Sequence, residues 1–306
     1  MNKRVPLPPH PHPHPQEFDL KIEDIRKRSQ ISDIWKRLRR NKLAMLGMVI
    51  VIVLLLSAIF APLIAPYDYA VQDLANAKAW PSLAHPLGTD DYGRDLLSRI
   101  IYGGRVSLLV AILAIVFGLI VGGSIGVSAG YFSGIYDGTI MRLMDVVMAV
   151  PGFLLAVCIS SALGTGVTNT AIAIGIGCVP GYARLLRAQV LSIRDQEYIE
   201  AARATGASNV RIMLLQIVPN ILSPVIVDST LRIGGCILMI SSLSFIGLGV
   251  QPPIPEWGSI LSAGRQFIRS FWPIVVFPGL AIMLTLFGFN LFGDGLRDAL
   301  DPKLKR

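Results

Sequence analysis

The chain alternates long apolar stretches with polar segments. A helix needs roughly 20 mostly apolar residues to cross the hydrocarbon core of a membrane. Six stretches approach or reach that length, and the shortest of them, the fourth, extends back toward Gly164. The pattern therefore predicts an all-α membrane protein with six transmembrane helices. The predicted spans are residues 43–65, 106–130, 143–163, 171–184, 221–249 and 271–292.

A basic segment precedes the first span. Within residues 18–42, apolar side chains recur with helical spacing and are surrounded by Lys and Arg, which predicts an amphipathic helix. Such a helix can lie in the plane of the lipid headgroups, and docking on a partner subunit is the alternative. Upstream, residues 5–15 alternate Pro and His, which predicts an extended tail, with metal binding as the alternative. The apolar positions of the helix are Ile31, Ile34, Trp35 and Leu38.

Composition and charge placement support a membrane protein and orient it. Hydrophobic residues make up 53% of the chain and charged residues 16%, against roughly 25% charge in average soluble domains. Of 28 Lys and Arg residues, 21 lie on the side that holds both termini, six lie opposite, and Arg232 lies within a span. Because cytoplasmic loops carry excess Lys and Arg, both termini are predicted in the cytoplasm. The net charge of +8 reflects this topology and contact with anionic lipid, and it is a poor indication of nucleic-acid binding.

The loop between the first two spans is long and carries charges of both signs. Its aspartates and arginines alternate, so the segment at 66–103 is predicted to fold as an ion-paired cap outside the membrane. It would serve either as a structural lid or as a contact for an external binding protein. The alternating residues are Asp90, Asp91, Arg94, Asp95, Arg99 and Arg105.

The second span carries a glycine every fourth residue. This spacing places the glycines on one helical face, where a neighbouring backbone can approach closely. The repeat predicts close helix packing and is common in membrane proteins. Its members are Gly118, Gly122, Gly126 and Gly130.

A polar segment at 193–219 separates the fourth and fifth spans on the predicted cytoplasmic side. The stretch before Gly206 lacks Gly and Pro and is rich in Ala, which predicts a helix that Gly206 ends. Ser208 and Asn209 can cap a second helix over 210–217, and Pro219 marks the start of the fifth span. The pattern predicts two short helices joined by a tight glycine turn.

Several side chains of this loop suit contact with another protein. Ala201, Ala202 and Ala204 are small enough for close packing in a groove. Glu200 offers a carboxylate, either to Arg203 one turn along the helix or to a partner. Arg203 itself can act as a cationic anchor.

The motif EAA-x3-G followed by a proline resembles the signature of the permease subunits of binding-protein-dependent ABC importers. Here its positions are Glu200, Ala201, Ala202, Gly206 and Pro219. Three further stretches, at 85–108, 244–261 and 294–304, are similar to the C-type permease subunit of dipeptide and oligopeptide importers. Nickel permeases share this branch and most of these motifs.

The resemblance implies a type I ABC importer permease fold and half of a translocation pathway in a bacterial or archaeal plasma (inner) membrane. The implied partners are a homologous second permease subunit, two ABC ATPase subunits, an external peptide-binding protein and membrane lipid. ATP and Mg would bind to the ATPases, so no cofactor is expected on this chain. The coupling loop would receive the work of ATP hydrolysis. Nickel or another small solute is the alternative cargo, and an autonomous secondary transporter is the alternative class.

The residues themselves exclude several activities. No GxxxxGKS/T phosphate loop occurs, so ATP hydrolysis is expected on a separate subunit. His85 is the only His outside the N-terminal tract, and no catalytic constellation is present, so the chain is not expected to be an enzyme. Cys158, Cys178 and Cys236 lie in apolar stretches and suit small buried hydrophobic positions, without metal-binding spacing.

Two charges lie inside the fifth span. Asp228 and Arg232 are one helical turn apart and can pair with each other. Charges within a membrane are costly and usually face a partner or a polar cavity. They are therefore predicted either to line the passage or to form a structural ion pair between helices. Arg142 and Asp145, three residues apart, are predicted to form a structural pair.

The predicted organisation has five parts. Residues 1–42 form a cytoplasmic tail with the amphipathic helix, and residues 43–65 the first transmembrane helix. Residues 66–103 form the external loop. The permease core follows over 104–294 and contains the coupling loop, and residues 295–306 form a cytoplasmic tail.

Overall fold

The computed structural model describes residues 30–300. The Pro/His tract, the first part of the predicted amphipathic helix and the end of the C-terminal tail lie outside the described residues. Within them the chain is helical and forms no β-strand. The helices are α2 (Gln30–Arg40), α3 (Lys42–Ile59), α4 (Ala61–Ile64), α5 (Leu96–Phe132), α6 (Gly134–Ala149), α7 (Gly152–Leu163), α8 (Val167–Ile193), α9 (Glu197–Ala204), α10 (Asn209–Ile212), α11 (Leu222–Phe245), α12 (Trp257–Gly264) and α13 (Pro273–Leu300).

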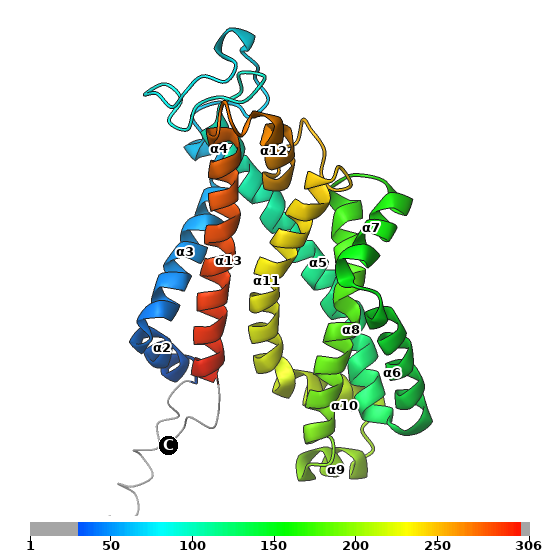
Figure 1. The fold of residues 1–306 in the computed structure, drawn as a ribbon. Coiled ribbons are helices and arrows are strands. Elements are labelled where there is room, and N and C mark those ends of the chain that lie inside the picture. Colours follow the sequence, from blue (N-terminus) through cyan, green and yellow to red (C-terminus); the bar gives the residue numbers. More distant parts are fainter. Residues whose placement is uncertain (1–29, 301–306) are drawn as a thin grey trace, which may run out of the picture.

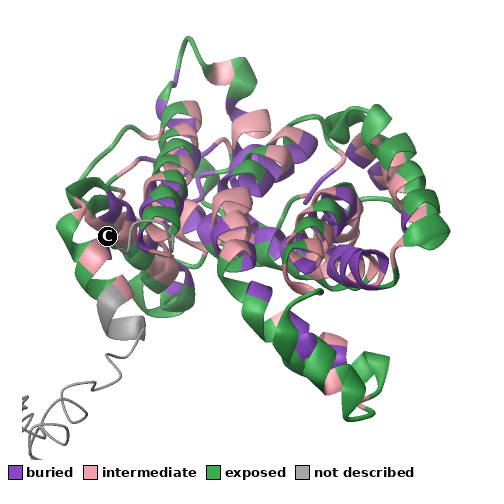
Figure 2. Cartoon of the chain, turned by 90° about the horizontal axis from the view of Figure 1, so that it is seen from below, coloured by how far each residue is buried: buried purple, intermediate pink, exposed green. Residues whose placement is uncertain are grey.

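The long helices run side by side between two ends of the molecule (Figure 1). We call residues 66–95 the cap, and the end where it lies the cap end. The opposite end, where α9 lies, is the loop end. α3 and α13 form one side of the bundle, and α6 and α7 form the other, with α5, α8 and α11 between them. Seen along the bundle, exposed residues cover the outer faces of the helices (Figure 2), and many of them are large and apolar.

The predicted helical membrane fold is confirmed. Five helical stretches of residues 30–300 are long and apolar enough to cross a membrane, and the pair α6–α7 supplies a sixth when it is counted as one span. The expectation of a continuous helix over 143–163 was wrong, because α6 and α7 meet at an angle of 86°. Pro151 has no N–H and disfavours helical geometry at Val150, which is extended.

Several spans are longer than predicted, and α5 and α8 show the cause most clearly. α5 begins at Leu96, about ten residues before the predicted start, because the Asp95 carboxylate caps it by accepting the Ser98 N–H at 2.7 Å. α8 extends beyond its apolar stretch to Ile193. Its polar extension carries Arg184 and Arg187, which pair with aspartates of α6. Ion pairing therefore allows helices to continue where hydropathy alone indicates an end.

The glycine repeat of α5 packs against α8 as predicted. A methyl group on Gly122 would lie 2.3 Å from the carbonyl oxygen of Val179, and one on Gly126 would lie 2.2 Å from that of Ala183. These distances leave room only for hydrogen. The backbones of α5 and α8 therefore touch along several turns, and the two helices form one tightly packed unit.

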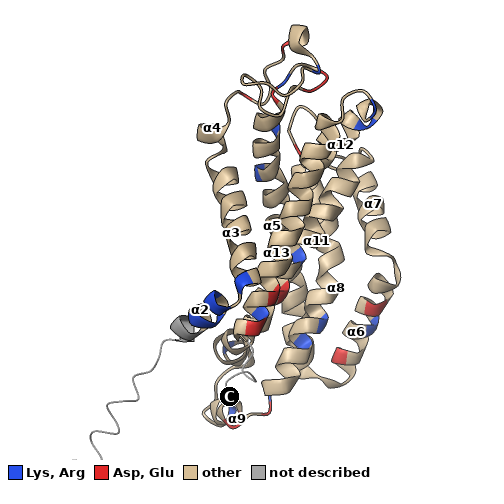
Figure 3. Cartoon of the chain, turned by 60° about the vertical axis from the view of Figure 1, so that its left-hand side comes forward, with Lys and Arg blue, Asp and Glu red and all other residues tan. Residues whose placement is uncertain are grey.

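The amphipathic helix is present as α2 over the described residues. Its Leu38 is buried with Ala44 of α3 and Ala299 of α13, while Trp35 is 47% exposed. The apolar stripe thus partly packs on the bundle itself. The described part of α2 is otherwise rich in basic residues, and the middle of the bundle is largely free of charge (Figure 3).

The cap is folded around buried ions, as its alternating charges predict. Asp90 accepts a hydrogen bond from Arg94 Nε at 2.6 Å and lies 3.3 Å from Arg99 Nε. Asp95 lies 2.9 Å from His85 Nδ1. Burial and the neighbouring Asp90 carboxylate raise the pKa of Asp91. The cap is therefore an ordered structure that holds the first turn of α5.

Two ion pairs hold α6 against α8 near the loop end. Arg187 donates two hydrogen bonds of 2.5 Å to the two carboxylate oxygens of Asp137, which is buried. Arg184 pairs with Asp145, and both of these side chains are about half exposed. Asp145 therefore does not pair with Arg142 as predicted, because α8 presents a closer cation.

These two pairs should contribute unequally to stability. Asp137→Asn weakens the bidentate pair of a buried carboxylate with the half-buried guanidinium of Arg187, so we expect a loss of about 1–3 kcal/mol. Asp145→Asn removes an exposed pair, for which at most about 1 kcal/mol is expected. Thermal unfolding of the detergent-solubilised protein measures both. Equal shifts in the two variants would contradict the assignment of Asp137 as the main clamp.

Candidate functional site

The segment between α8 and α11 forms the tip of the loop end (Figure 1). Gln196 is extended, and α9 begins after it at Glu197. At the far end of α9, Gly206 has a φ of +79°. The N–H of Gly206 binds the carbonyl of Arg203 at 3.0 Å, and the N–H of Ala207 binds that of Ala202 at 3.1 Å. This pair of bonds is the Schellman arrangement, which glycine at positive φ permits.

The second helix of the loop is shorter and less regular than predicted. Ser208 caps α10 by accepting the Arg211 N–H at 3.4 Å, as its side chain predicts. After Ile212 the chain forms a π-helical turn over Met213–Ile217 and a 3₁₀ turn over Val218–Ile221. Pro219 cannot donate a backbone hydrogen bond, so a regular helix cannot pass through it into α11.

Three isoleucines anchor the loop to the bundle. Ile199, Ile212 and Ile217 are fully buried, and Ala202 packs against the same core. The other residues of the predicted motif are exposed at the surface: Glu200, Ala201, Arg203, Gly206 and Pro219. Most of the motif is therefore exposed. Its helical part, α9, is anchored to the bundle by the buried side chain of Ile199.

The predicted pair between Glu200 and Arg203 is absent from the described ion pairs of residues 30–300. Arg203 instead lies over the ring of Tyr131, with its guanidinium carbon 5.2 Å from the ring centroid. The Glu200 carboxylate is exposed and has no hydrogen bond within the described chain. It is therefore free to meet a charge on another protein.

The last turn of α5 receives contacts from both halves of the loop. Asn209 does not cap α10, since its side-chain oxygen accepts the Tyr131 hydroxyl at 2.8 Å. Arg194, at the end of α8, donates to the carbonyl of Gly130 at 3.2 Å and to the Ser133 hydroxyl. Sequence reasoning missed this cluster, because nothing local marks a tyrosine 78 residues upstream as the partner of Asn209.

The two charges within the fifth span are paired. Arg232 donates to Asp228 within α11 itself, so the predicted pair is not between helices. The guanidinium lies over the ring of Tyr182, 4.9 Å from its centroid, and fills the space above Gly181 of α8. The Asp228 carboxylate and the Tyr182 ring together stabilise the Arg232 cation in its apolar surroundings.

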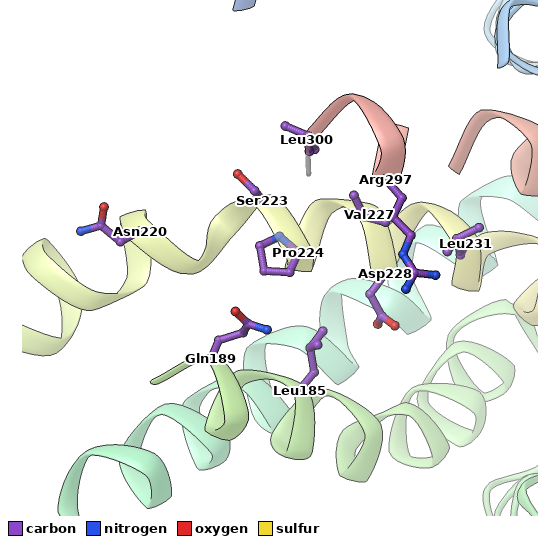
Figure 4. A pocket seen from close by; sticks show the side chains of 10 residues that line it. All are labelled: Leu185, Gln189, Asn220, Ser223, Pro224, Val227, Asp228, Leu231, Arg297 and Leu300. Carbon is purple, nitrogen blue, oxygen red and sulfur yellow. The ribbon is translucent and has the colours of Figure 1, made fainter. Parts of the chain in front are cut away.

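Asp228 also faces a cavity of about 630 Å³ between α8, α11 and α13. Figure 4 shows Asp228 and Arg297 extending into it from α11 and α13. The cavity is thus lined by one carboxylate, one guanidinium, side-chain amides and apolar groups. Its lining residues are Leu185, Gln189, Asn220, Ser223, Pro224, Val227, Asp228, Leu231, Arg297 and Leu300.

Among residues 30–300, no three His, Cys, Asp or Glu side chains gather in a way that could hold a metal ion. Cys178 and Cys236 are buried as predicted, and Cys158 is exposed on α7. The described part of the chain therefore offers two candidate sites, the exposed surface of α9 and the polar cavity.

Comparison with known proteins gives two family matches. Residues 122–306 match the family described as binding-protein-dependent transport system inner membrane component. Residues 29–86 match the N-terminal TM domain of oligopeptide transport permease C. Together these matches cover the described residues except 87–121, which hold the end of the cap and most of α5.

Curated relatives extend over nearly the whole chain. The dipeptide transport system permease protein DppC of Escherichia coli is 51% identical over 282 residues, covering 90% of this chain and 94% of the relative. DppC of Alkalihalophilus pseudofirmus is 45% identical over 273 residues, covering 89% and 90%. The glutathione transport system permease protein GsiD of Shigella flexneri is 47% identical over 274 residues, covering 89% and 90%.

Among solved structures, the MetNI methionine ABC transporter in an inward facing conformation aligns with a TM-score of 0.54 at 17% identity. The alignment covers 66% of this chain and 97% of that chain. At this low sequence identity, the match is evidence for a shared fold only. It confirms the predicted ABC importer permease fold.

Proposed function

The chain belongs to the family of binding-protein-dependent transport system inner membrane components, and we propose that it forms half of the translocation pathway of an ATP-driven importer of dipeptides and oligopeptides. The observation that carries the proposal is the exposed α9, with Glu200 and Ala201 outward and Ile199 fixing it from behind. The relatives named as dipeptide permeases support the cargo.

The proposed coupling runs through the loop at 193–219. α9 stands at the tip of the loop end, where a partner can reach it (Figure 1). Its alanines allow a groove to close around it, and its exposed Glu200 and Arg203 offer one charge of each sign. The excess of Lys and Arg on the same side supports a cytoplasmic location for the loop and for both termini.

The proposed assembly contains a second, homologous permease chain, two ABC ATPase subunits and an external peptide-binding protein. ATP and Mg bind to the ATPases, since this sequence holds no phosphate loop. ATP-driven closure of those subunits pushes on α9 and switches the pathway between outward and inward access. The pathway candidate on this chain is Asp228 with its partner Arg232, because Asp228 faces a cavity shared by three helices.

A second cargo is supported by the relative named as a glutathione permease. Glutathione is itself a small peptide, so the same polar cavity suits both substrates. Nickel remains the alternative that the shared motifs of the branch suggest.

Reconstitution tests the function directly. The chain is assembled with its second permease, both ATPases and the binding protein in proteoliposomes, and uptake of a labelled dipeptide, glutathione and Ni²⁺ is compared. We expect ATP-dependent dipeptide uptake that requires every subunit. Uptake by this chain alone, or a complete assembly that moves Ni²⁺ and no peptide, would overturn the proposal.

Charge reversal on α9 tests the docking surface. Glu200→Lys should lower uptake about tenfold or more, because a lost charge-assisted contact at an interface and a new repulsion each cost more than about 1 kcal/mol. Glu197→Lys, one turn earlier on the same exposed helix, is the matched control. Membrane insertion of both variants should be normal. A similar loss in both would mean that α9 responds to charge in general and that Glu200 has no specific partner.

A further inference from the structure

We propose that α5 is the mechanical link between the coupling loop and α12 at the cap end, with Tyr131 receiving the loop's movement and Ser107 passing it to the buried carboxylate of Glu256. The inference rests on the proposed function, since it assigns a route to the coupling. Tyr131, Ser107 and Glu256 are positioning residues in this scheme.

The coupling loop contacts α5 at the last turn of that helix. Three separate parts of the loop hold it: Arg194 at its start, Arg203 on α9 and Asn209 on α10. Two of them act on the same side chain, because the Tyr131 ring lies under Arg203 and its hydroxyl donates to Asn209. Tyr131 is only 8% exposed, so it cannot turn away when the loop moves. A displacement of α9 must therefore displace the end of α5.

The helix between the two ends is continuous. α5 has 37 residues without a proline, which gives a length of about 55 Å at 1.5 Å per residue. This is longer than the roughly 30 Å hydrocarbon core. The backbone contacts of Gly122 and Gly126 lock α5 to α8 and prevent the two helices from sliding past each other. In contrast, α6–α7 is bent by 86° and cannot transmit an axial push.

At the cap end, α5 would pass its movement to α12 through the contacts between these two helices. Ser107 of α5 donates to Glu256 Oε1 at 3.1 Å, and Ser241 of α11 donates to the same oxygen at 3.3 Å. The other oxygen, Oε2, accepts the N–H of Ser259 at 2.9 Å and caps α12. Glu256 is fully buried, so its carboxylate joins three helices at one point.

Trp257 makes the same junction rigid. Its indole N–H donates to the carbonyl of Ile100 at 2.9 Å, and its ring fills the space left by Gly103 and Gly104 on α5. A carboxylate that is buried among neutral donors is costly. Packing alone could have joined these helices with apolar side chains. The polar junction instead makes the position of α12 depend on the position of α5.

The test uses the complete transporter in proteoliposomes. Tyr131→Phe removes the bond to Asn209 and keeps the ring under Arg203, and Ser107→Ala removes the bond from α5 to Glu256. Tyr136→Phe and Ser124→Ala are the matched controls. Tyr136 belongs to the same aromatic cluster but bonds to Ser128, and Ser124 bonds within α5 to Ile120.

Two quantities are measured for each variant: peptide moved per ATP hydrolysed, and stimulation of ATP hydrolysis by the loaded binding protein added outside. We expect both to fall about threefold to tenfold in Tyr131→Phe and Ser107→Ala, the range that one hydrogen bond contributes. The controls should stay at the wild-type value. Melting temperature and subunit assembly should match the controls, which a merely structural role would not predict.

The double variant separates a shared route from two independent effects. If both residues serve one route, Tyr131→Phe with Ser107→Ala should be no worse than the more severe single variant. Multiplied losses in the double variant, or single variants that behave like the controls, would overturn the inference. Failure of the wild-type complex to move peptide would instead overturn the proposed function.

Discussion

Replacing Gly206 with proline is expected to abolish peptide uptake while the protein still inserts into the membrane. Gly206 adopts a φ of +79°, and its N–H bonds to the carbonyl of Arg203. Proline fixes φ near about −65° and has no N–H, so it removes both features. A strained residue costs about 1–3 kcal/mol. A loss of about 2 kcal/mol lowers the population of the native turn about thirtyfold.

The Gly206→Pro substitution should change only the angle between α9 and the rest of the loop. A side chain at Gly206 would meet nothing within 4 Å, so the bundle itself is not disturbed. α9 would leave the turn at another angle and present Glu200 away from its partner. Uptake of labelled dipeptide by cells, with membrane protein quantified in parallel, measures the effect.

Gly206→Asn is the control for this prediction. Asparagine tolerates positive φ better than other side chains and keeps its N–H. We therefore expect Gly206→Asn to retain most of the uptake. Normal uptake in Gly206→Pro, or equal losses in both variants, would contradict a role for this turn geometry in aiming α9.

The local features of the loop could be predicted from the sequence because their causes are local. The glycine turn and the Ser208 cap depend on residues at most five positions apart, and both are present. The irregular turns after Ile212 have a local cause as well, since Pro219 interrupts the bonding pattern. The sequence carries this signal in Pro219, but a proline at that position predicts only a helix boundary and not the form of the turns before it.

The contacts that join distant segments could not be predicted in this way. Tyr131 reaches Asn209 across 78 residues, and Ser107 reaches Glu256 across 149. Arg184 rather than Arg142 pairs with Asp145, although Arg142 is nearer in sequence. The choice depends on which face of α6 is turned toward α8. Single-sequence patterns carry that information only weakly.

Hydropathy located the spans well and their ends poorly. α3 and α13 contain uninterrupted apolar runs, and both lie where the pattern predicts them. α5 begins about ten residues before its predicted start because Asp95 caps it and because the buried Arg99 lies beside the carboxylate of Asp90. The free energy of a charge depends on its partner, and the partner is known only once the chain has folded.

Gly126→Val is expected to prevent the stable packing of the bundle, the largest loss of stability among the substitutions considered. A Cβ atom at Gly126 would lie 2.2 Å from the carbonyl oxygen of Ala183 and 2.9 Å from its Cα. Both are backbone atoms of α8 and cannot rotate away. The helices must separate, which also opens the contact at Gly122. Overpacking costs about 1–3 kcal/mol and occasionally more, and here we expect at least about 3 kcal/mol.

Gly123→Ala on the same helix separates this steric effect from the loss of glycine as such. Its added methyl group would lie 3.4 Å from the end of the Leu186 side chain, which is ordinary contact. Alanine also favours helix over glycine by about 1 kcal/mol. Thermal unfolding of the solubilised protein should therefore show a large downward shift for Gly126→Val and no loss for Gly123→Ala. Two similar shifts would mean that α5 and α8 do not meet backbone to backbone, and α5 would then lack the support that a force-bearing helix requires.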